Sequence, residues 1–176
     1  TDTITQNGAT QYSVNGNRAI GVLAGNQGAK VTHDATVADK CRRVTNELKD
    51  LSLILSRRAA NNVVVVPTAQ PGPLTFNVVS KDADGFAFFT VSSGDDVFHN
   101  SKVQQIDVKN DQVKASVIVI NVPGKSVTFD GGNMVGSLTQ LETRARVLFN
   151  FFEAEQISMK RNFMGALLAP LAAVQT

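Results

Sequence analysis

The clearest hydrophobic pattern in the chain lies between residues 37 and 58. Apolar residues recur there at alternating spacings of four and three: Val37, Cys41, Val44, Leu48, Leu51 and Leu55. This spacing places them on one face of an α-helix, opposite a mostly charged face. The pattern predicts a helix over about 37–58 whose apolar stripe packs on a core. Cys41 lies within the stripe and is expected to be a small core residue.

After residue 63 the pattern changes to short strands separated by turn residues such as Asp84-Gly85 and Pro123-Gly124. The predicted strands are 63–66, 74–79, 86–91, 103–108, 113–122, 126–129, 147–152, 156–160 and 163–168. Two of them, around Val117–Ile120 and Phe86–Phe89, are apolar on both faces. Such strands need cover on both faces, and the helix is the element available for the second face.

The expected fold class is mainly β, a right-handed β-solenoid with one long α-helix (about 37–58) packed along one face. The helix would be about 33 Å long, and five or six turns of β-solenoid with an N-terminal one would reach about 29 Å. Truncating Leu48 or Leu51 to Ala would then cost about 2–5 kcal/mol. A β-sandwich is the alternative, although a long helix before most of the strands is unusual for one.

The length of 176 residues indicates one domain over 1–176. Its predicted parts are N-terminal strands and turns (1–33), the helix (34–60), the solenoid turns (63–170) and a tail (171–176). Asn7-Gly8 and Asn15-Gly16 are turn pairs between the short N-terminal strands.

The charge balance argues against nucleic-acid and membrane-surface binding. The 17 Lys and Arg residues are scattered among 15 Asp and Glu residues, and the net charge is +2. No apolar run is long enough for a spanning helix. The chain does not open on a signal-peptide pattern, so a mature, processed product is expected. A single cysteine excludes an internal disulfide framework and a multi-cysteine zinc site.

Residues that carry catalytic chemistry are sparse. Neither His33 nor His99 has metal-ligand spacing. Ser92 or Ser93 with Asp96 and His99 would be a conceivable triad, but no Gly-x-Ser-x-Gly elbow supports it, and loop polarity is the favoured interpretation. We therefore expect no enzyme, no catalytic residue and no cofactor.

Two further motifs are weak. Asp82 and Asp84, with Asp95 and Asp96 nearby in sequence, would allow a loose calcium site, but the distant bidentate Glu is missing and a solvated turn is favoured. Gly124-Lys125-Ser126 is similar to the tail of a phosphate-binding loop without its upstream glycine or its following helix.

The C-terminal block carries a family resemblance. The matching residues are Leu148, Asn150, Phe151, Glu153 and Ala154, followed by Gly165, Leu168, Ala169 and Pro170. This pattern resembles the end of the bacterial choice-of-anchor A domain of secreted and surface-anchored proteins, with Phe149 in place of the usual Trp. The layout of a long helix beside short strands is also similar to ice-binding-type β-solenoids. The resemblance implies an extracellular or cell-surface location, but the chain carries no sorting motif after Val174.

These observations together predict a non-enzymatic extracellular or cell-surface structural or adhesive module. An ice-binding or carbohydrate-binding protein is the alternative, and a hydrolase on a solenoid scaffold is a further competitor. Isolated threonines, such as Thr75, Thr90, Thr128 and Thr139, do not form the regular array that ice binding needs.

The expected partners are copies of the same chain, joined through open strand edges, with extracellular matrix or polysaccharide as a further partner. The segment Thr1–Val14 is strand-like and would add to a neighbour's edge, giving end-to-end fibres. In the alternative, residues 169–176 fold back over their own last strand or pair with Ile20–Ala24 of the same chain.

Overall fold

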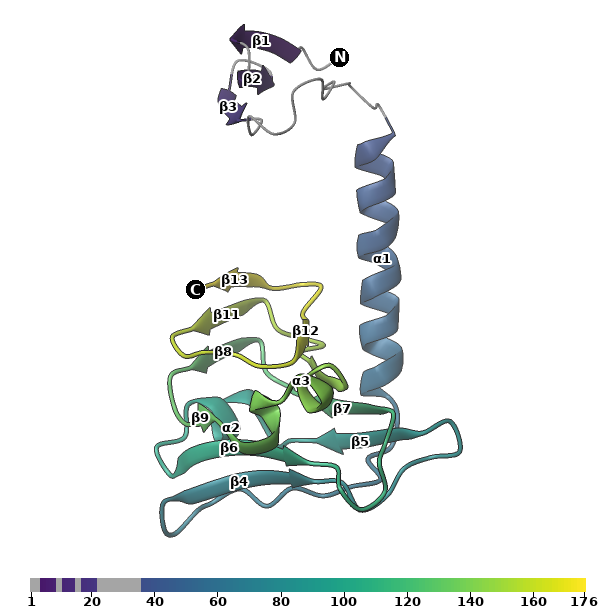
Figure 1. Cartoon of the computed structure of the whole chain (residues 1–176), viewed down its shortest axis with the longest axis vertical. Coiled ribbons are helices and arrows are strands. Elements are labelled where there is room, and N and C mark those ends of the chain that lie inside the picture. The colour runs from purple at the N-terminus through teal and green to yellow at the C-terminus, as the bar shows by residue number, and fades with distance from the viewer. Residues whose placement is uncertain (1–3, 9–10, 15–16, 22–35) are drawn as a thin grey trace. The chain divides into compact units, whose positions relative to one another are not determined.

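The computed structural model describes residues 4–8, 11–14, 17–21 and 36–176, with side chains from residue 36 onward. The chain divides into two compact units, Thr1–Arg43 and Val44–Thr176. His33 and the Asn15-Gly16 pair lie outside the described residues. Figure 1 shows the elements of both units.

The first unit holds a small antiparallel sheet in the order β1 (Ile4–Gly8), β2 (Gln11–Val14) and β3 (Asn17–Gly21). Adjacent strands follow each other directly along the chain, as the turn-rich sequence predicts. The long helix α1 (Val37–Ser56) begins in this unit and ends in the second one.

The second unit is built on three short parallel sheets (Figure 1). The four-stranded sheet has the order β12 (Ala166–Leu168), β10 (Val147–Asn150), β7 (Val117–Asn121) and β5 (Phe86–Thr90). The second sheet has the order β13 (Ala173–Gln175), β11 (Gln156–Met159) and β8 (Ser126–Phe129). The third has the order β4 (Gly72–Asn77), β6 (Val103–Lys109) and β9 (Asn133–Met134).

Three short helical segments lie between these strands in the chain. They are α2 (Gly94–Phe98), the 3-10 helix η2 (Gly136–Thr139) and α3 (Leu141–Arg144). Ser93 caps α2, because its side chain accepts a hydrogen bond from the backbone N–H of Asp96. Val97 and Phe98 of this helix are buried, so α2 contributes to the core.

The core between the three sheets is rich in phenylalanine. Phe76, Phe89 and Phe149 are fully buried, and their rings meet edge to face, with centroids 5.2 Å apart for Phe76 and Phe89. Phe98 packs on Phe129 in the same way at 5.3 Å. This geometry is the favourable one for aromatic pairs, so the inward residues of each strand hold the sheets together.

The predicted fold class is wrong. The structure is a mixed α/β fold with several short parallel sheets and three α-helices in the described residues, and not a mainly-β, right-handed β-solenoid. The prediction assumed about six turns of similar length, whereas the parallel strands vary from two to seven residues. Turn residues indicate where strands end, but they do not indicate how long each repeat is or which strands pair.

The predicted cover of the helix also needs correction. α1 ends at Ser56, and its buried residues are Ser52 and Leu55. Most of the apolar stripe that was expected to pack along one face is exposed, and Cys41 is exposed as well. A 3.6-residue period shows that a helix has an apolar face, but it does not show what covers that face.

Candidate functional site

The last turns of α1 are held to the four-stranded sheet by a buried polar cluster. The side-chain amide of Asn150 on β10 donates to the carbonyl oxygen of Ser52 at 2.9 Å and to Oδ1 of Asn121 at 2.8 Å. The Ser52 hydroxyl donates back to Oδ1 of Asn150 at 2.6 Å. Asn121 on β7 donates to the carbonyl oxygen of Leu55 at 3.0 Å. These bonds fix where the helix lies on the sheet.

Leu55 adds an apolar contact to this polar cluster. It is 8% exposed and packs in a small cluster with Phe88, Val119 and Leu168, which lie on the outer face of the four-stranded sheet. The outer face beside this cluster is less well covered, because Phe86, Val117 and Leu148 are only partly buried. The sheet therefore presents more apolar surface than the end of α1 covers.

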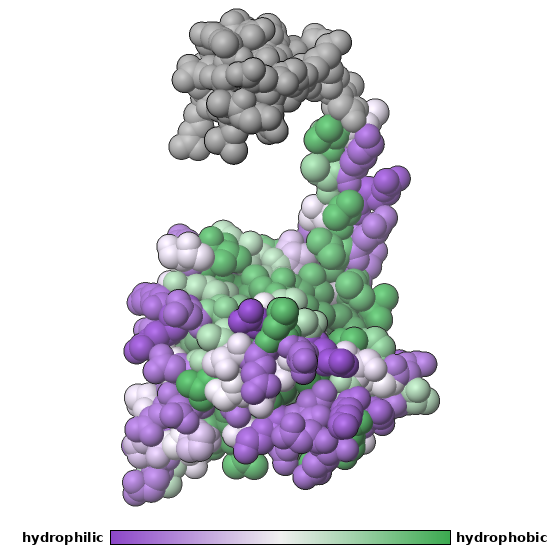
Figure 2. Space-filling model, in the orientation of Figure 1, coloured by the Kyte–Doolittle hydropathy of each residue, from purple (hydrophilic) through white to green (hydrophobic). Residues whose placement is uncertain are grey.

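The rest of the apolar stripe in the second unit is open to solvent. Val44 is 49% exposed, Leu48 41% and Leu51 43%. We call these three residues the open stripe. Figure 2 shows the apolar residues gathered along one side of α1 and on the adjoining surface of the second unit. An apolar stripe of this kind normally lies against a partner surface.

Two of the sheets end in C-terminal strands, β12 and β13, and each of these strands has one edge with which no other strand of the described residues pairs. β12 and β13 are the last strands of their sheets. The side chains of β13 are exposed, and Leu171 and Val174 are 51% and 44% exposed. We call β12, β13 and the connection between them the open end. An unpaired edge beside exposed apolar residues is a template for strand pairing.

The opposite edge of the four-stranded sheet, along β5, is closed by two asparagines. The Asn61 side chain accepts from the N–H of Phe88 at 2.8 Å and donates to the carbonyl of Phe86 at 3.2 Å. The backbone N–H groups of Asn61 and Asn62 both donate to the carbonyl of Phe88. Val64 and Val66 then pack on the core. The first strand edge of this sheet is therefore capped, whereas no residue that the structure describes caps the last.

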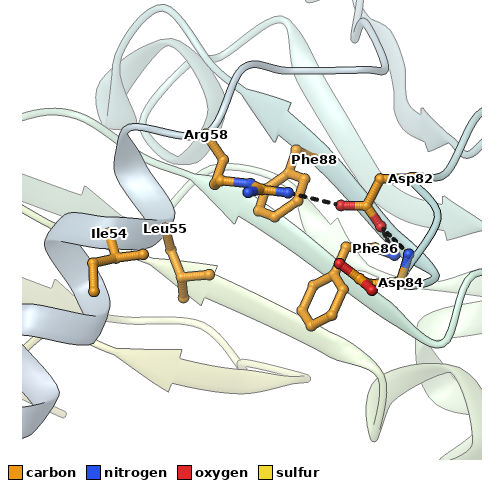
Figure 3. Close-up of a pocket in the computed structure, with 7 residues that line it drawn as sticks. All are labelled: Ile54, Leu55, Arg58, Asp82, Asp84, Phe86 and Phe88. Carbon is orange, nitrogen blue, oxygen red and sulfur yellow. Dashed lines mark hydrogen bonds and ion pairs between the residues drawn. The ribbon is translucent and has the colours of Figure 1, made fainter.

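A shallow pocket of about 210 Å³ lies where α1 ends beside β5 (Figure 3). Ile54 and Leu55 line it from the helix, and Phe86 and Phe88 line it from the strand. The two rings are stacked with centroids 5.9 Å apart. The guanidinium of Arg58 lies over the Phe88 ring at 5.5 Å, a cation–π contact. The pocket thus combines an aromatic wall with a cationic rim.

An ion pair forms the polar side of this pocket. Arg58 donates to Oδ2 of Asp82 at 3.1 Å, and Oδ1 of Asp82 accepts the backbone N–H groups of Phe86 and Asp84. The hydrogen bond from Phe86 N–H, aided by Arg58, holds the pKa of Asp82 below its usual value. Asp82 is therefore a carboxylate at neutral pH. The pocket can hold a ring against the phenylalanines while its polar groups meet Arg58 or the exposed Asp84.

The residues of the conceivable triad do not come together. Nδ1 of His99 lies 2.6 Å from Oδ1 of Asp130, while the Ser92 hydroxyl donates to Asp96 and the Ser93 hydroxyl caps α2. Asp130 raises the pKa of His99, and His99 in turn lowers the pKa of Asp130. No sequence motif links His99 with Asp130, because the two residues lie 31 positions apart in the chain.

The four candidate calcium ligands are divided between two places. Asp82 and Asp84 lie in the turn before β5, and Asp95 and Asp96 lie in α2. Among the described residues, no group of three or more His, Cys, Asp or Glu side chains has an arrangement that could hold a metal ion. Gly124-Lys125-Ser126 forms the turn into β8, and the N–H of Gly124 donates to Glu153 at 2.8 Å.

The residues that carry the family resemblance have structural roles. Asn150 holds α1, Glu153 accepts the N–H of Gly124, and Ala154 is fully buried. Gly165 has a φ of +116°, where a Cβ atom would lie 3.2 Å from the Phe149 ring. The motif therefore fixes the end of the sheet and the helix on it.

A family model described as "Putative Ice-binding-like adhesive domain" matches residues 1–176. The match covers the whole chain, so the chain belongs to this family of adhesive, ice-binding-like domains. No curated protein and no solved structure matches the chain. No helix in the described part of the chain is long and apolar enough to cross a membrane.

Sequence reasoning missed several of the residues that shape these surfaces. Ser52 lies within the predicted helix and Asn61 just after it, and neither belongs to a pattern that indicates a contact with the sheet. Arg58 lies at the end of the predicted helix, and an arginine just after an apolar stripe and before an aromatic strand is a candidate for a cation–π contact. Asn121 and Asn150 carried the strongest available signal, since each ends an otherwise apolar strand.

Proposed function

We propose that this chain is a non-enzymatic adhesive module that acts outside the cell or at its surface. The family description, which names adhesion and no reaction, supports the proposal. A specific relationship to choice-of-anchor A domains is part of the proposal. Its support is the motif around Asn150 and Gly165, whose residues hold the helix and the last strands in place.

The observation that carries the proposal is the open stripe beside the open end. Val44, Leu48 and Leu51 expose apolar surface on α1, and β12 and β13 each have one edge that is unpaired within the described part of the chain. Apolar surface next to unpaired edges is typical of protein contact surfaces. The partner that we propose is a second copy of the same chain. A fibre and a closed pair are the two assemblies that such a surface allows.

A bead-aggregation assay tests the adhesive function. Beads that carry the chain should clump with one another, and Leu48→Lys should abolish the clumping because it places a charge in the open stripe. Leu53→Lys is the matched control, since Leu53 has a similar exposure of 44% on another face of α1. Clumping that is equal in all three samples, or absent from the unmodified chain, contradicts the proposal.

Carbohydrate binding is a second candidate, which the pocket of Figure 3 favours. Phe86 offers a ring face on which a sugar ring can lie, and Arg58 and Asp84 offer charged partners for its hydroxyl groups. Calorimetric titration with soluble polysaccharides tests this candidate. Phe86→Ala should remove any binding, whereas Leu48→Lys, which lies outside the pocket, should leave it unchanged.

Ice binding remains the other alternative in the proposal, because the family is described as ice-binding-like. A thermal-hysteresis measurement on the full chain distinguishes it from adhesion. A clear freezing-point gap would favour ice binding over the adhesive function.

A further inference from the structure

We infer that two copies of this chain join through their open ends as a closed pair, each laying the Val44 end of its open stripe over the β12 of the other. The inference rests on the proposed self-association and specifies its geometry. Three features of the second unit support it. The first is the level of the open stripe, by which we mean the strand of the four-stranded sheet beside which each helix residue lies. The others are the uncovered part of the sheet and the difference between its two edges.

The level of the open stripe follows from the asparagine bonds. Asn121 on β7 meets the carbonyl of Leu55, and Asn150 on β10 meets the carbonyl of Ser52. Three residues of helix rise about 4.5 Å, close to the spacing of about 4.8 Å between strands. Lys49 therefore lies near the level of β12, and Val44 lies about 7.5 Å beyond it. That length covers at least one further strand.

A strand added at the edge of β12 would occupy the place that the Val44 end of the open stripe covers. It would continue the contact that Leu55 already makes with the outer face of the four-stranded sheet. The side chains best suited to face Val44 and Leu48 are small or apolar. β12 itself has this character, with Ala166 exposed and Leu168 buried at 7% exposure.

The uncovered part of the sheet fits the same arrangement. Leu148 on β10 is partly buried and its neighbour Ala166 on β12 is exposed, beside the region that α1 covers. When two β12 edges meet around a twofold axis perpendicular to the sheet, both helices lie on the same face. Leu148 and Ala166 then lie beside the contact between the two copies. The pocket at Phe86 is two strands further from the contact than β10 and stays open.

The capped edge excludes a continuous chain of copies along this sheet. A fibre needs the last strand of one copy to pair with the first strand of the next. Here the first strand is β5, and Asn61 and Asn62 already bond with Phe86 and Phe88 along it. Among the described residues, the β12 edge is the only edge of this sheet without a partner, so the like edges meet and the assembly closes at two copies.

Sedimentation velocity of the full chain over a range of concentrations tests this geometry. We expect a species of twice the 18.8 kDa of one chain that does not grow further with concentration. Leu48→Lys and Val44→Lys should each give the mass of one chain, and Leu53→Lys should keep the pair. Circular dichroism of each variant confirms that it is folded.

The outcomes separate the inference from the function on which it rests. A single-chain mass at every concentration overturns both. Masses that grow beyond two chains overturn the closed pair and keep self-association as a fibre. A pair that survives both lysine substitutions places the contact elsewhere and overturns the inference alone.

Discussion

Asn121 and Asn150 make the polar contacts that matter most for the position of α1. Both side chains are fully buried, and no buried side-chain nitrogen or oxygen in the described residues is left without a partner. A buried amide that loses its partners costs more than the bond itself contributes, because the remaining groups stay desolvated. The resemblance motif in the sequence included Asn150, but its partner Ser52 lies 98 residues earlier and nothing linked the two.

Replacing Asn150 with Ala should lower the free energy of unfolding by about 1–3 kcal/mol. The substitution leaves the Ser52 hydroxyl, the Ser52 carbonyl and Oδ1 of Asn121 without their partner. Urea unfolding followed by circular dichroism measures the change. Asn77→Ala, at an exposed position of β4, serves as the control and should have little effect. Equal losses in both variants would contradict the role of Asn150.

The pair of His99 and Asp130 gives the chain a pH dependence at the residue scale. Asp130 raises the pKa of His99 above its usual 6.5, so the stability from charged His99 is complete below 6.5 and disappears as the pH rises through the raised pKa. His99 lowers the pKa of Asp130 below 3.8, so that contribution exists above 3.8 and disappears on further acidification.

The melting temperature of His99→Gln should therefore fall below that of the unmodified chain at about pH 5 and equal it at about pH 9. Differential scanning fluorimetry at both values measures this difference. The effect is small because both side chains are partly exposed, His99 by 56%. A deficit that is the same at both pH values would show that the ion pair is not its cause.

At the scale of elements, the sequence predicted the long helix and most of the strands, but residues 63–66 form no strand, and β9 and β13 were not predicted. The 4–3 spacing of apolar residues and the Gly and Pro turns are local signals, and local signals determine where elements begin and end. The short helices α2, η2 and α3 were missed because four or five residues show no period. Ser93 followed by Asp96 was nevertheless a capping signal for α2.

Because the two leucines of α1 are buried to different extents, truncating them should lower the free energy of unfolding by different amounts. Leu55→Ala should cost about 2–5 kcal/mol, since Leu55 is buried against Phe88 and Val119. Leu48→Ala should cost less than about 1 kcal/mol, because Leu48 is 41% exposed. Urea unfolding of both variants, at concentrations low enough to keep single chains, decides this. A larger loss for Leu48 than for Leu55 would contradict the observed packing.

At the scale of the whole molecule, the sequence alone did not predict which strands pair with one another, and the predicted fold class was wrong for that reason. Strand patterns specify which side chains point inward, but they do not specify how many residues separate successive strands in each sheet. Val117–Asn121 pairs with both Phe86–Thr90 and Val147–Asn150, at sequence separations of about thirty residues, with other strands between them. Pairings at this distance depend on the packing of Phe76, Phe89 and Phe149 in the core, which no local pattern records.

The small net charge predicts how the proposed association responds to salt. The chain carries a net charge of +2, and the contact surface is the apolar open stripe. Raising the salt from about 50 mM to about 500 mM should therefore leave the associated fraction unchanged or increase it. Sedimentation at both concentrations measures this. Dissociation at high salt would indicate a contact made by charges.

The asparagine bonds also set a limit on how far a helix can follow a sheet. Three residues of α1 rise by nearly the spacing between two strands. They turn the helix by about 300°, so each carbonyl points about 60° away from the direction of the carbonyl three residues earlier. The carbonyl of Ser52 is thus already rotated relative to that of Leu55, and the carbonyl of Lys49 is rotated twice as far. The next position on the sheet is Leu168 and not a third asparagine. After two strands, the carbonyl groups of the helix therefore no longer point at the outward residues of the next strand. In a longer sheet beside this helix, the contacts with further strands must come from helix side chains alone.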